Sequence, residues 1–290
     1  MSRILITGAT GFIGSHLVPR LADRHEVHAL ARNVPAGGAA GVHWIEQDLS
    51  RPLEAQRLPG RVDALIHLAQ SYRFREFPEG AADTFAVNVQ STFRLLEYAR
   101  QAGAEQFIHA SSGGVYGYSY ESLAETAPVD PLNFYISSKY SAELLTASYR
   151  QFFRTVVFRF FFVYGPGQKG MLVPNLMQRV VGGQTITVQG KPGIRINPVY
   201  VDDAVGVFEP ALRLQTSELF NVAGDQVVTI TELVRLMGEL AGKTPVVEYT
   251  ETRYRGDLVG DNARMKTVLG AAPKVPLADG LARVLESLPQ

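Results

Sequence analysis

The chain has 290 residues, with 28 basic and 28 acidic side chains and no cysteine. The balanced charge gives no electrostatic reason to expect nucleic acid or an anionic membrane as a partner, and the lack of cysteine excludes disulfides, thiolate metal sites and a cysteine nucleophile. The six histidines show no His-x-x-x-His spacing, so we expect no metal site. Neither a secretory signal pattern nor a run of about 18 apolar residues is found, which predicts a soluble cytoplasmic protein.

Short β-branched runs alternate with longer stretches of helical period through the first half of the chain. This alternation predicts parallel strands joined by crossover helices, and the continuously apolar runs predict a sheet that is covered on both faces. The fold class is therefore α/β, a doubly wound parallel sheet of the Rossmann type. The expected strands are 3–7, 26–30, 42–46, 63–69, 106–111 and 155–163, and the expected helices are 13–24, 82–103 and 134–152.

After residue 170 the alternation loosens into shorter strands, prolines and smaller helices, of which 199–208 and 229–242 are the clearest elements. A smaller C-terminal substrate-binding region is therefore expected on the same scaffold, and Asp202 is predicted to cap the helix that follows VYVD. The expected dinucleotide-binding domain comprises residues 1–165 and about 196–223, and the expected substrate-binding region comprises about 166–195 and 224–290.

A glycine-rich turn, ITGATGFIGSHL, follows the first predicted strand and opens the first helix. Small residues let the backbone approach a pyrophosphate closely, and the N-terminus of the helix presents free N–H groups to it. An ordinary turn is the alternative, which the strand before it and the helix after it make the weaker interpretation. The residues expected to hold the dinucleotide here are Gly8, Gly11, Phe12, Ile13 and Gly14.

The residues that follow the next three strands are expected to contact the same cofactor. Arg32 stands where a carboxylate would bind the ribose of NAD, and a guanidinium suits a 2′-phosphate, so NADP is favoured and NAD remains possible. A solvent-facing arginine is the alternative. Asp48 and Leu49 are expected near the adenine, and Leu68 and Ala69 leave room for the cofactor.

The segment YISSK places Tyr135 and Lys139 four residues apart, on one face of a predicted helix. This spacing alone also occurs in many ordinary helices. A tyrosine pKa of about 10 is too high for a general base at neutral pH, and a nearby lysine cation together with a positive nicotinamide ring would lower it. Ser112 ends the preceding strand, at the edge where open α/β sheets bind ligands, and is predicted to hold the substrate oxygen.

Six segments in this order resemble the extended short-chain dehydrogenase/reductases, a family of nucleotide-sugar epimerases, dehydratases and reductases. They are GATGFIG, ASSGGVYG, YISSK, RFFFVYGPGQ, VYVDD and DNARMKTVLG, and the resemblance covers most of the chain. It implies Tyr135 as the acid/base, Lys139 as its partner that also holds the cofactor, and Ser112 as the hydrogen bond to the reacting oxygen. Asn88 is placed with the cofactor-binding residues, a buried hydrogen bond within a helix being the alternative. A homodimer through the helices of Asn88 and Tyr135 is implied as well.

Departures from the family's patterns bear on the reaction. Gly113 and Gly114 follow Ser112, where relatives that catalyse 4,6-dehydration place an Asp-Glu pair, so dehydration is not expected. Relatives that epimerise carbons 3 and 5 use a cysteine, which this chain lacks. Phe162 replaces an asparagine that helps to seat the sugar nucleotide. Tyr254, between Arg253 and Arg255, replaces an arginine near the diphosphate.

These observations predict an NAD(P)-dependent epimerase or ketoreductase. It would transfer a hydride at a carbinol or keto carbon, with C4 of a nucleotide sugar as the expected position. The predicted substrate contacts are Ser112, Gly113 and Arg195. A reductase or dehydrogenase of a small carbonyl compound without a nucleotide is one alternative, which the changes at Phe162 and Tyr254 keep open. A non-catalytic dinucleotide sensor is another, against which the intact Ser/Tyr/Lys trio argues.

Overall fold

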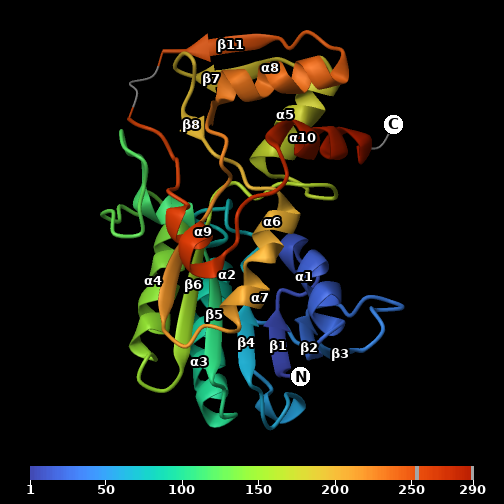
Figure 1. Cartoon of the computed structure of the whole chain (residues 1–290), viewed down its shortest axis with the longest axis vertical. Coiled ribbons are helices and arrows are strands. Elements are labelled where there is room, and N and C mark those ends of the chain that lie inside the picture. The colour runs from blue at the N-terminus through green and yellow to red at the C-terminus, as the bar shows by residue number, and fades with distance from the viewer. Residues whose placement is uncertain (252–254, 289–290) are drawn as a thin grey trace. The chain divides into compact units, whose positions relative to one another are not determined.

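The computed structural model describes residues 1–251 and 255–288, which form two compact units (Figure 1). Tyr254 and Arg253 lie outside the described residues. Unit 1 comprises Met1–Val115, Asp130–Arg159 and Phe208–Phe220, and unit 2 comprises Tyr116–Val129, Phe160–Val207 and Asn221–Gln290. The division into a cofactor-binding domain and a substrate-binding region remains a prediction about what these parts do.

A seven-stranded sheet has the order β3-β2-β1-β4-β5-β6-β9. All neighbouring strands from β3 to β5 pair in parallel. From β1 the chain adds β2 and β3 on one side of the sheet, and it then crosses over to add β4 and β5 on the other side. Such a reversal is where doubly wound sheets bind their ligands, so the predicted Rossmann class is confirmed. The strands are β1 (Arg3–Thr7), β2 (Glu26–Ala31), β3 (Val42–Glu46), β4 (Ala64–His67), β5 (Gln106–Ser112), β6 (Arg154–Phe160) and β9 (Glu218–Val222).

Helices cover this sheet because its central strands are apolar on both faces. Leu5, Leu65 and Phe107, on neighbouring strands, form one buried cluster with Leu95 and Leu96 of a covering helix. Burying such side chains contributes about 1.5–3 kcal/mol each, which makes this cluster a main source of stability in unit 1. The covering helices are α1 (Phe12–Ala22), α2 (Ala81–Phe85), α3 (Ser91–Gln101) and α4 (Phe134–Ser148), with α7 (Phe208–Ala211) and the short turns η1 (Ala55–Arg57) and η3 (Gly113–Tyr116).

The helix expected over 82–103 is present but contains a π-helical turn, η2 (Ala86–Gln90), between α2 and α3. Such turns occur often at functional sites, and this one carries Asn88. Helix α4 begins where expected because Asn133 caps it, accepting a hydrogen bond from the backbone N–H of Ile136 at 3.0 Å.

Unit 2 consists of short elements, as the sequence predicts. The expected cap at Asp202 is wrong. Helix α6 (Val201–Gly206) has Tyr200 at its N-cap position, and Asp202 lies within the first turn of the helix. The first N–H of the helix, that of Val201, instead donates to the backbone oxygen of Tyr164 at 2.8 Å. The other elements are α5 (Leu172–Val181), β7 (Ile186–Gln189), β8 (Arg195–Ile196), β10 (Val228–Thr229), α8 (Ile230–Ala241), β11 (Val247–Thr250), α9 (Ala263–Leu269) and α10 (Leu277–Glu286).

Three buried asparagines hold the irregular chain of unit 2. Asn197 donates to the backbone oxygens of Gly224 and Gly260, at 3.0 and 2.8 Å, and accepts from the N–H of Gly260 at 3.0 Å. Asn221 and Asn262 bind other backbone oxygens in the same way. Within the described ranges, none of the helices is both long and apolar enough to span a bilayer.

Candidate active site

The glycine-rich turn forms a cradle that only glycine permits at two positions. Gly8 has a φ of 67°, and a Cβ atom there would lie 2.7 Å from the backbone nitrogen of Ala69. A Cβ atom at Gly14 would lie 2.2 Å from the oxygen of Gly8. Among the described residues, no side chain caps α1 at Gly11, and its first turn has no acidic residue. The free N–H groups and the close backbone approach fit the pyrophosphate of a dinucleotide.

The residues expected at the adenosine end lie on the carboxyl side of β2 and β3. Arg32 is exposed, and its guanidinium carbon lies 4.7 Å from the centre of the Tyr72 ring, a cation–π contact. Asp48 accepts hydrogen bonds from the N–H and the hydroxyl of Ser50 at 2.9 and 2.8 Å. Burial acts to raise the pKa of Asp48, but the two Ser50 bonds and the charges of Arg32 and Arg51 together outweigh it and hold this pKa below its usual value. Leu49 is buried.

At the other end, α4 carries Tyr135 and Lys139 one turn apart. Lys139 is only 3% exposed, and its Nζ donates to the backbone oxygen of Ala110 on β5 at 2.8 Å. The hydroxyl of half-buried Tyr135 donates to Oε1 of Gln70 at 3.0 Å. Ser112 ends β5, and its Oγ accepts from the N–H of Gly114 at 3.1 Å. Strand β5 and helix α4 thus supply all three polar groups of the predicted trio.

Burial governs the protonation of this pair. It raises the pKa of Tyr135 to about 12, against a smaller opposing effect of the Arg75 charge. It lowers the pKa of Lys139 to about 8, against the opposing effect of Glu143. Burial thus raises the pKa of Tyr135, and the expected lowering by Lys139 together with a positive nicotinamide ring stays a prediction. Lys139 is still mostly protonated at neutral pH.

A buried ion pair fixes the same face of α4 to the sheet. Glu143, one turn beyond Lys139, accepts from Nη2 of Arg159 at 2.6 Å and from its Nε at 3.1 Å, and the hydroxyl of Ser111 donates to it as well. Both charged side chains are less than a tenth exposed. Breaking such a pair leaves an uncompensated buried charge, so this contact strongly restricts how α4 can move.

Asn88 lies within a chain of hydrogen bonds that the sequence did not reveal. Its Oδ1 accepts from the N–H of Ser71 at 2.9 Å, and its Nδ2 donates to the hydroxyl of Ser138 at 2.8 Å. The hydroxyl of Ser138 donates to the backbone oxygen of Tyr135 at 2.6 Å. Asn88 is thus buried and hydrogen-bonded to two other segments, as in the alternative to a cofactor contact. Its role in cofactor binding stays a prediction.

Two further sequence candidates lie in unit 2. Arg195 donates from its backbone N–H and its Nε to buried Asp257, at 2.7 and 2.5 Å, while its side chain stays about half exposed. Phe162 has a φ of 45°, a backbone conformation that asparagine tolerates better than phenylalanine. The role of Arg195 in binding substrate stays a prediction.

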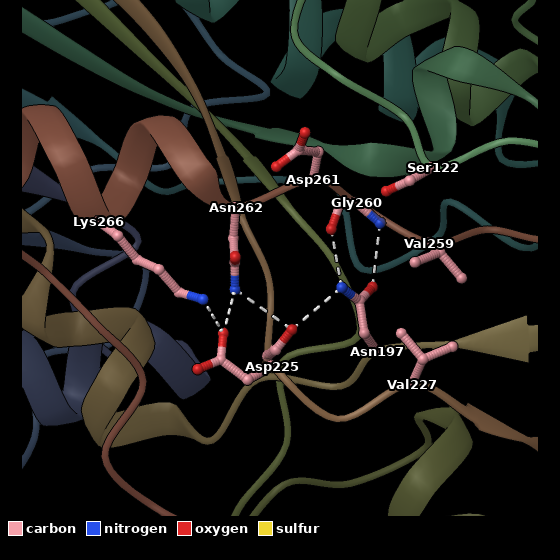
Figure 2. Close-up of a pocket in the computed structure, with 10 residues that line it drawn as sticks. Ser122, Asn197, Asp225, Val227, Val259, Gly260, Asp261, Asn262 and Lys266 are labelled. Atoms are coloured by element: carbon pink, nitrogen blue, oxygen red, sulfur yellow. Dashed lines mark hydrogen bonds and ion pairs between the residues drawn. The ribbon is translucent and has the colours of Figure 1, made fainter.

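Unit 2 also contains a cavity of about 410 Å³ with a polar lining. Figure 2 shows the side chains of Asn197 and Asn262 converging on the backbone around Asp225. Asp225 also forms an ion pair with Lys266 at 2.6 Å. These side chains bind the protein's own backbone and one another, so they connect neighbouring loops and stabilise the fold around the cavity.

In unit 1, a cluster of possible metal ligands forms at the other end of the strands. Glu26 and His28 on β2 and His43 on β3 bring ligand atoms within 4.8 Å of one another, which the sequence spacing did not suggest. The carboxylate already accepts from Arg3 at 2.8 Å and from His28 at 2.9 Å, and the two imidazole rings are stacked rather than aimed at one point. These contacts describe an ion-paired edge of the sheet.

The sheet order and the glycine cradle at its switch point define a protein of the Rossmann class, in which this turn is the usual place of a dinucleotide. Comparison with known proteins narrows this class. The profile of the NAD dependent epimerase/dehydratase family matches residues 4–223, and the chain belongs to this family, a group of extended short-chain dehydrogenase/reductases.

Relatives are similar over almost the whole chain. A UDP-glucose 4-epimerase of Mycolicibacterium smegmatis is 31% identical over 98% of this chain and 97% of its own length. A dTDP-D-glucose 4,6-dehydratase of Mus musculus is 28% identical over 98% of this chain and 88% of its own. The solved structure of MoeE5 in complex with UDP-glucuronic acid and NAD has a TM-score of 0.85, at 29% identity and 98% coverage of both chains. That complex contains NAD, so the preference for NADP expected from Arg32 is not supported.

Proposed function

We propose that this protein is a UDP-sugar 4-epimerase that uses NAD. The observation that carries the proposal is that buried Lys139, one turn from Tyr135 on α4, donates to the oxygen of Ala110 on β5, the strand that Ser112 ends. Support comes from the glycine cradle of the same unit and from a relative named as a UDP-glucose 4-epimerase. The alternatives are a reductase or dehydrogenase of a small carbonyl compound without a nucleotide, which the change at Phe162 keeps open, and a dinucleotide sensor without catalysis.

In this proposal each residue of the trio has a separate task. Gly8 and Gly14 would hold NAD, which when bound would accept the hydride and give it back. Tyr135 takes the proton of the C4 hydroxyl as the hydride leaves and returns a proton when the hydride comes back. Ser112 holds the reacting oxygen. The ammonium of Lys139 lowers the cost of the phenolate during turnover, when the positive nicotinamide adds to its charge.

The loop after Ser112 argues for epimerisation rather than dehydration. Gly114 carries no side chain, and Ile136 would have to shift for a larger residue, because a Cβ atom there would lie 2.6 Å from Cδ1 of Ile136 and 3.3 Å from Oγ of Ser112. No carboxylic acid is therefore available at this position to protonate a leaving hydroxyl. We propose that the chain differs in this step from the relative named as a 4,6-dehydratase.

The cofactor proposal rests on the contact between Arg32 and Tyr72. The stacking holds the guanidinium against the Tyr72 ring, and the complex of MoeE5 contains NAD, so NAD should bind at least as tightly as NADP. Titration of both nucleotides into the wild type and Arg32→Ala tests this, and we expect similar losses for both in the variant. NADP binding ten-fold tighter than NAD, with a loss confined to NADP in the variant, would restore the preference expected from the sequence.

Unit 1 also exposes apolar side chains along the helices expected at a dimer interface. Phe85 and Phe93 on α2 and α3 are 46% and 48% exposed, and Leu144 of α4 is 54% exposed. We propose that a second copy of the chain covers them. Sedimentation of the wild type and of Phe93→Asp tests this, with a dimer expected for the first and a shift to monomer for the second. A monomeric wild type would contradict it.

An activity panel tests the reaction itself. The purified protein is incubated with NAD and, separately, with UDP-glucose, UDP-glucuronic acid and dTDP-glucose, and the products are separated by ion-exchange chromatography. We expect the 4-epimer of a UDP sugar. A 4-keto-6-deoxy product, or no conversion of any of the three, would contradict the proposal. Mass spectrometry under gentle conditions adds a second readout, since an epimerase that recycles its NAD is expected to retain it.

A further inference from the structure

The hydroxyl of Tyr135 has one described hydrogen-bond partner, Gln70, which follows β4 and which the sequence did not single out. We propose that Gln70 is a positioning residue for Tyr135, holding the phenol oxygen through its side-chain amide in both protonation states. This inference deepens the proposed function, because it rests on Tyr135 as the acid/base. A positioning role requires a fixed support, a matching pair of hydrogen-bonding groups and an effect on proton transfer.

The support is fixed because the backbones at both ends of the contact are tied together. Next to Gln70, the N–H of Ser71 donates to Asn88, which donates to Ser138, which in turn donates to the backbone oxygen of Tyr135. The hydroxyl of Ser71 also donates to Asp83. This chain of bonds sets the separation of the two segments independently of the Gln70 side chain.

The ring of Tyr135 is held as well. Phe74, four residues beyond Gln70, packs against it with ring centres 4.7 Å apart. The ring and its supporting backbone are therefore held, and the remaining freedom lies in the hydroxyl hydrogen and in the exposed side chain of Gln70. Oε1 of Gln70 lies 3.0 Å from the phenol oxygen and sets that direction.

A glutamine suits this place because it carries both a donor and an acceptor at its end. Its carbonyl accepts from the phenol, as seen here, and rotation of the amide about its last torsion brings an N–H donor to the same place for the phenolate. A hydrogen bond to a charged oxygen is stronger than one between neutral groups. The net effect of Gln70 should therefore be to favour the phenolate and lower the pKa at which Tyr135 becomes a base.

Three variants separate the properties of this side chain. Gln70→Leu keeps its size without hydrogen bonding, Gln70→Asn keeps the amide on a shorter stem, and Gln70→Glu keeps only the acceptor and adds a repelling charge. Gln56→Leu makes the same change at an exposed position and serves as the control. We expect the acidic limb of the pH profile of kcat/KM to move up by about one unit in the Leu and Asn variants and further in the Glu variant.

The first readout is this pH profile, measured with the UDP sugar that the activity panel identifies, together with NAD affinity by calorimetry. Activity in Gln70→Leu should fall about ten-fold at neutral pH and recover at alkaline pH, with NAD affinity within a few-fold of wild type. Profiles that superimpose on wild type, or that move to lower pH, would overturn the inference. A loss of activity that is equal at every pH would also overturn it.

The second readout needs neither substrate nor NAD. Unfolding by urea is measured for Gln70→Leu, Tyr135→Phe and the double variant, and their effects are compared. Effects that do not add would establish the contact, and additive effects would refute it. The proposed function fails separately: a Tyr135→Phe variant that remains active would refute the catalytic role of Tyr135, whereas an inactive Tyr135→Phe with unchanged Gln70 profiles would refute only the role of Gln70.

Discussion

The two units use buried polar side chains for different purposes. In unit 1, buried Lys139 lies one turn from Tyr135 on α4, and a regular helix places both side chains. In unit 2, Asn197 and Asn221 are buried equally well, but their amides bind the backbone of irregular chain. The difference teaches that burial alone does not identify a functional group. Polar groups placed by regular elements with hydrogen-bonding capacity to spare are candidates for chemistry, whereas those saturated by backbone contacts hold the fold.

The largest expected effect is in unit 1. Tyr135→Phe removes the proton-transferring oxygen and should lower kcat/KM by roughly 10²–10⁴-fold, the usual contribution of a general acid or base. NAD affinity should change little, and the free energy of unfolding should fall by about 1 kcal/mol, because the bond to Gln70 is lost while the ring and its contact with Phe74 remain. Steady-state kinetics and calorimetry measure this. A variant that retains more than about a tenth of the activity would remove Tyr135 from the catalytic role.

The converse effect is expected in unit 2. Asn197→Ala would remove the side-chain partner of the N–H and the oxygen of Gly260 and would leave the oxygen of Gly224 with its 3.3 Å bond from Asn262, at a cost of about 3 kcal/mol in the free energy of unfolding. Asn175→Ala, an exposed change on α5, is the matched control and should cost less than about 0.5 kcal/mol. Urea unfolding measures both. Equal stability of the two variants would show that the asparagine ties are not structural.

Lys139→Met tests whether a buried side chain in unit 1 serves function rather than the fold. The variant should lose activity and gain free energy of unfolding. The pKa of Lys139 falls from 10.5 to about 8 on folding, so the charged lysine costs the native state up to about 3 kcal/mol below pH 8. The unfolded chain binds the proton more tightly, so wild-type stability from this group rises between pH 8 and pH 10.5. The variant should therefore have a higher free energy of unfolding than wild type at pH 7, although the lost bond to Ala110 takes back part of this gain. The difference between the two proteins should shrink at pH 10.

Urea unfolding of the Lys139→Met variant at both pH values measures this advantage, and kinetics should show weaker NAD binding and a raised pH optimum. A variant that is no more stable than wild type at pH 7 would contradict the burial cost. Unchanged affinity together with an unchanged pH profile would make Lys139 an ordinary helix lysine.

The smallest effect is again expected in unit 2. Thr229 caps α8, because its hydroxyl oxygen accepts a hydrogen bond from the N–H of Glu232 at 3.1 Å. In return, the carboxylate of Glu232 accepts a hydrogen bond from the N–H of Thr229. Thr229→Ala should cost about 1 kcal/mol of stability without altering kcat. Thermal unfolding and kinetics at 25 °C test the pair of expectations. A loss of kcat in the fully folded variant would show that the N-terminus of α8 has more than a structural role.

Local patterns predicted much of unit 1. The strands over 3–7 and 42–46 have the expected bounds, and Ser112 ends β5 as expected, because apolar runs and glycine turns are short-range signals. The spacing of Tyr135 and Lys139 placed them one turn apart, again from local information. The direction of the pKa of Tyr135 was not predictable, since it depends on how deeply the ring is buried.

Contacts between distant segments explain what the sequence missed. Gln70 and Tyr135 are 65 positions apart, and Asn221 binds a backbone oxygen 98 positions away. The cap expected at Asp202 failed for the same reason, because the oxygen of Tyr164 satisfies the helix instead. No short window of sequence carries such information.

The central claim is that hydrogen leaves C4 of a UDP sugar and returns to the same carbon. UDP-glucose deuterated at C4, incubated with the protein and NAD in ordinary water, tests it most directly by NMR of the product. Because a hydride does not exchange with water whereas the proton handled by Tyr135 does, we predict UDP-galactose that still carries deuterium at C4. Deuterium found at C6 of a 4-keto-6-deoxy sugar, or lost to the solvent, would contradict the account.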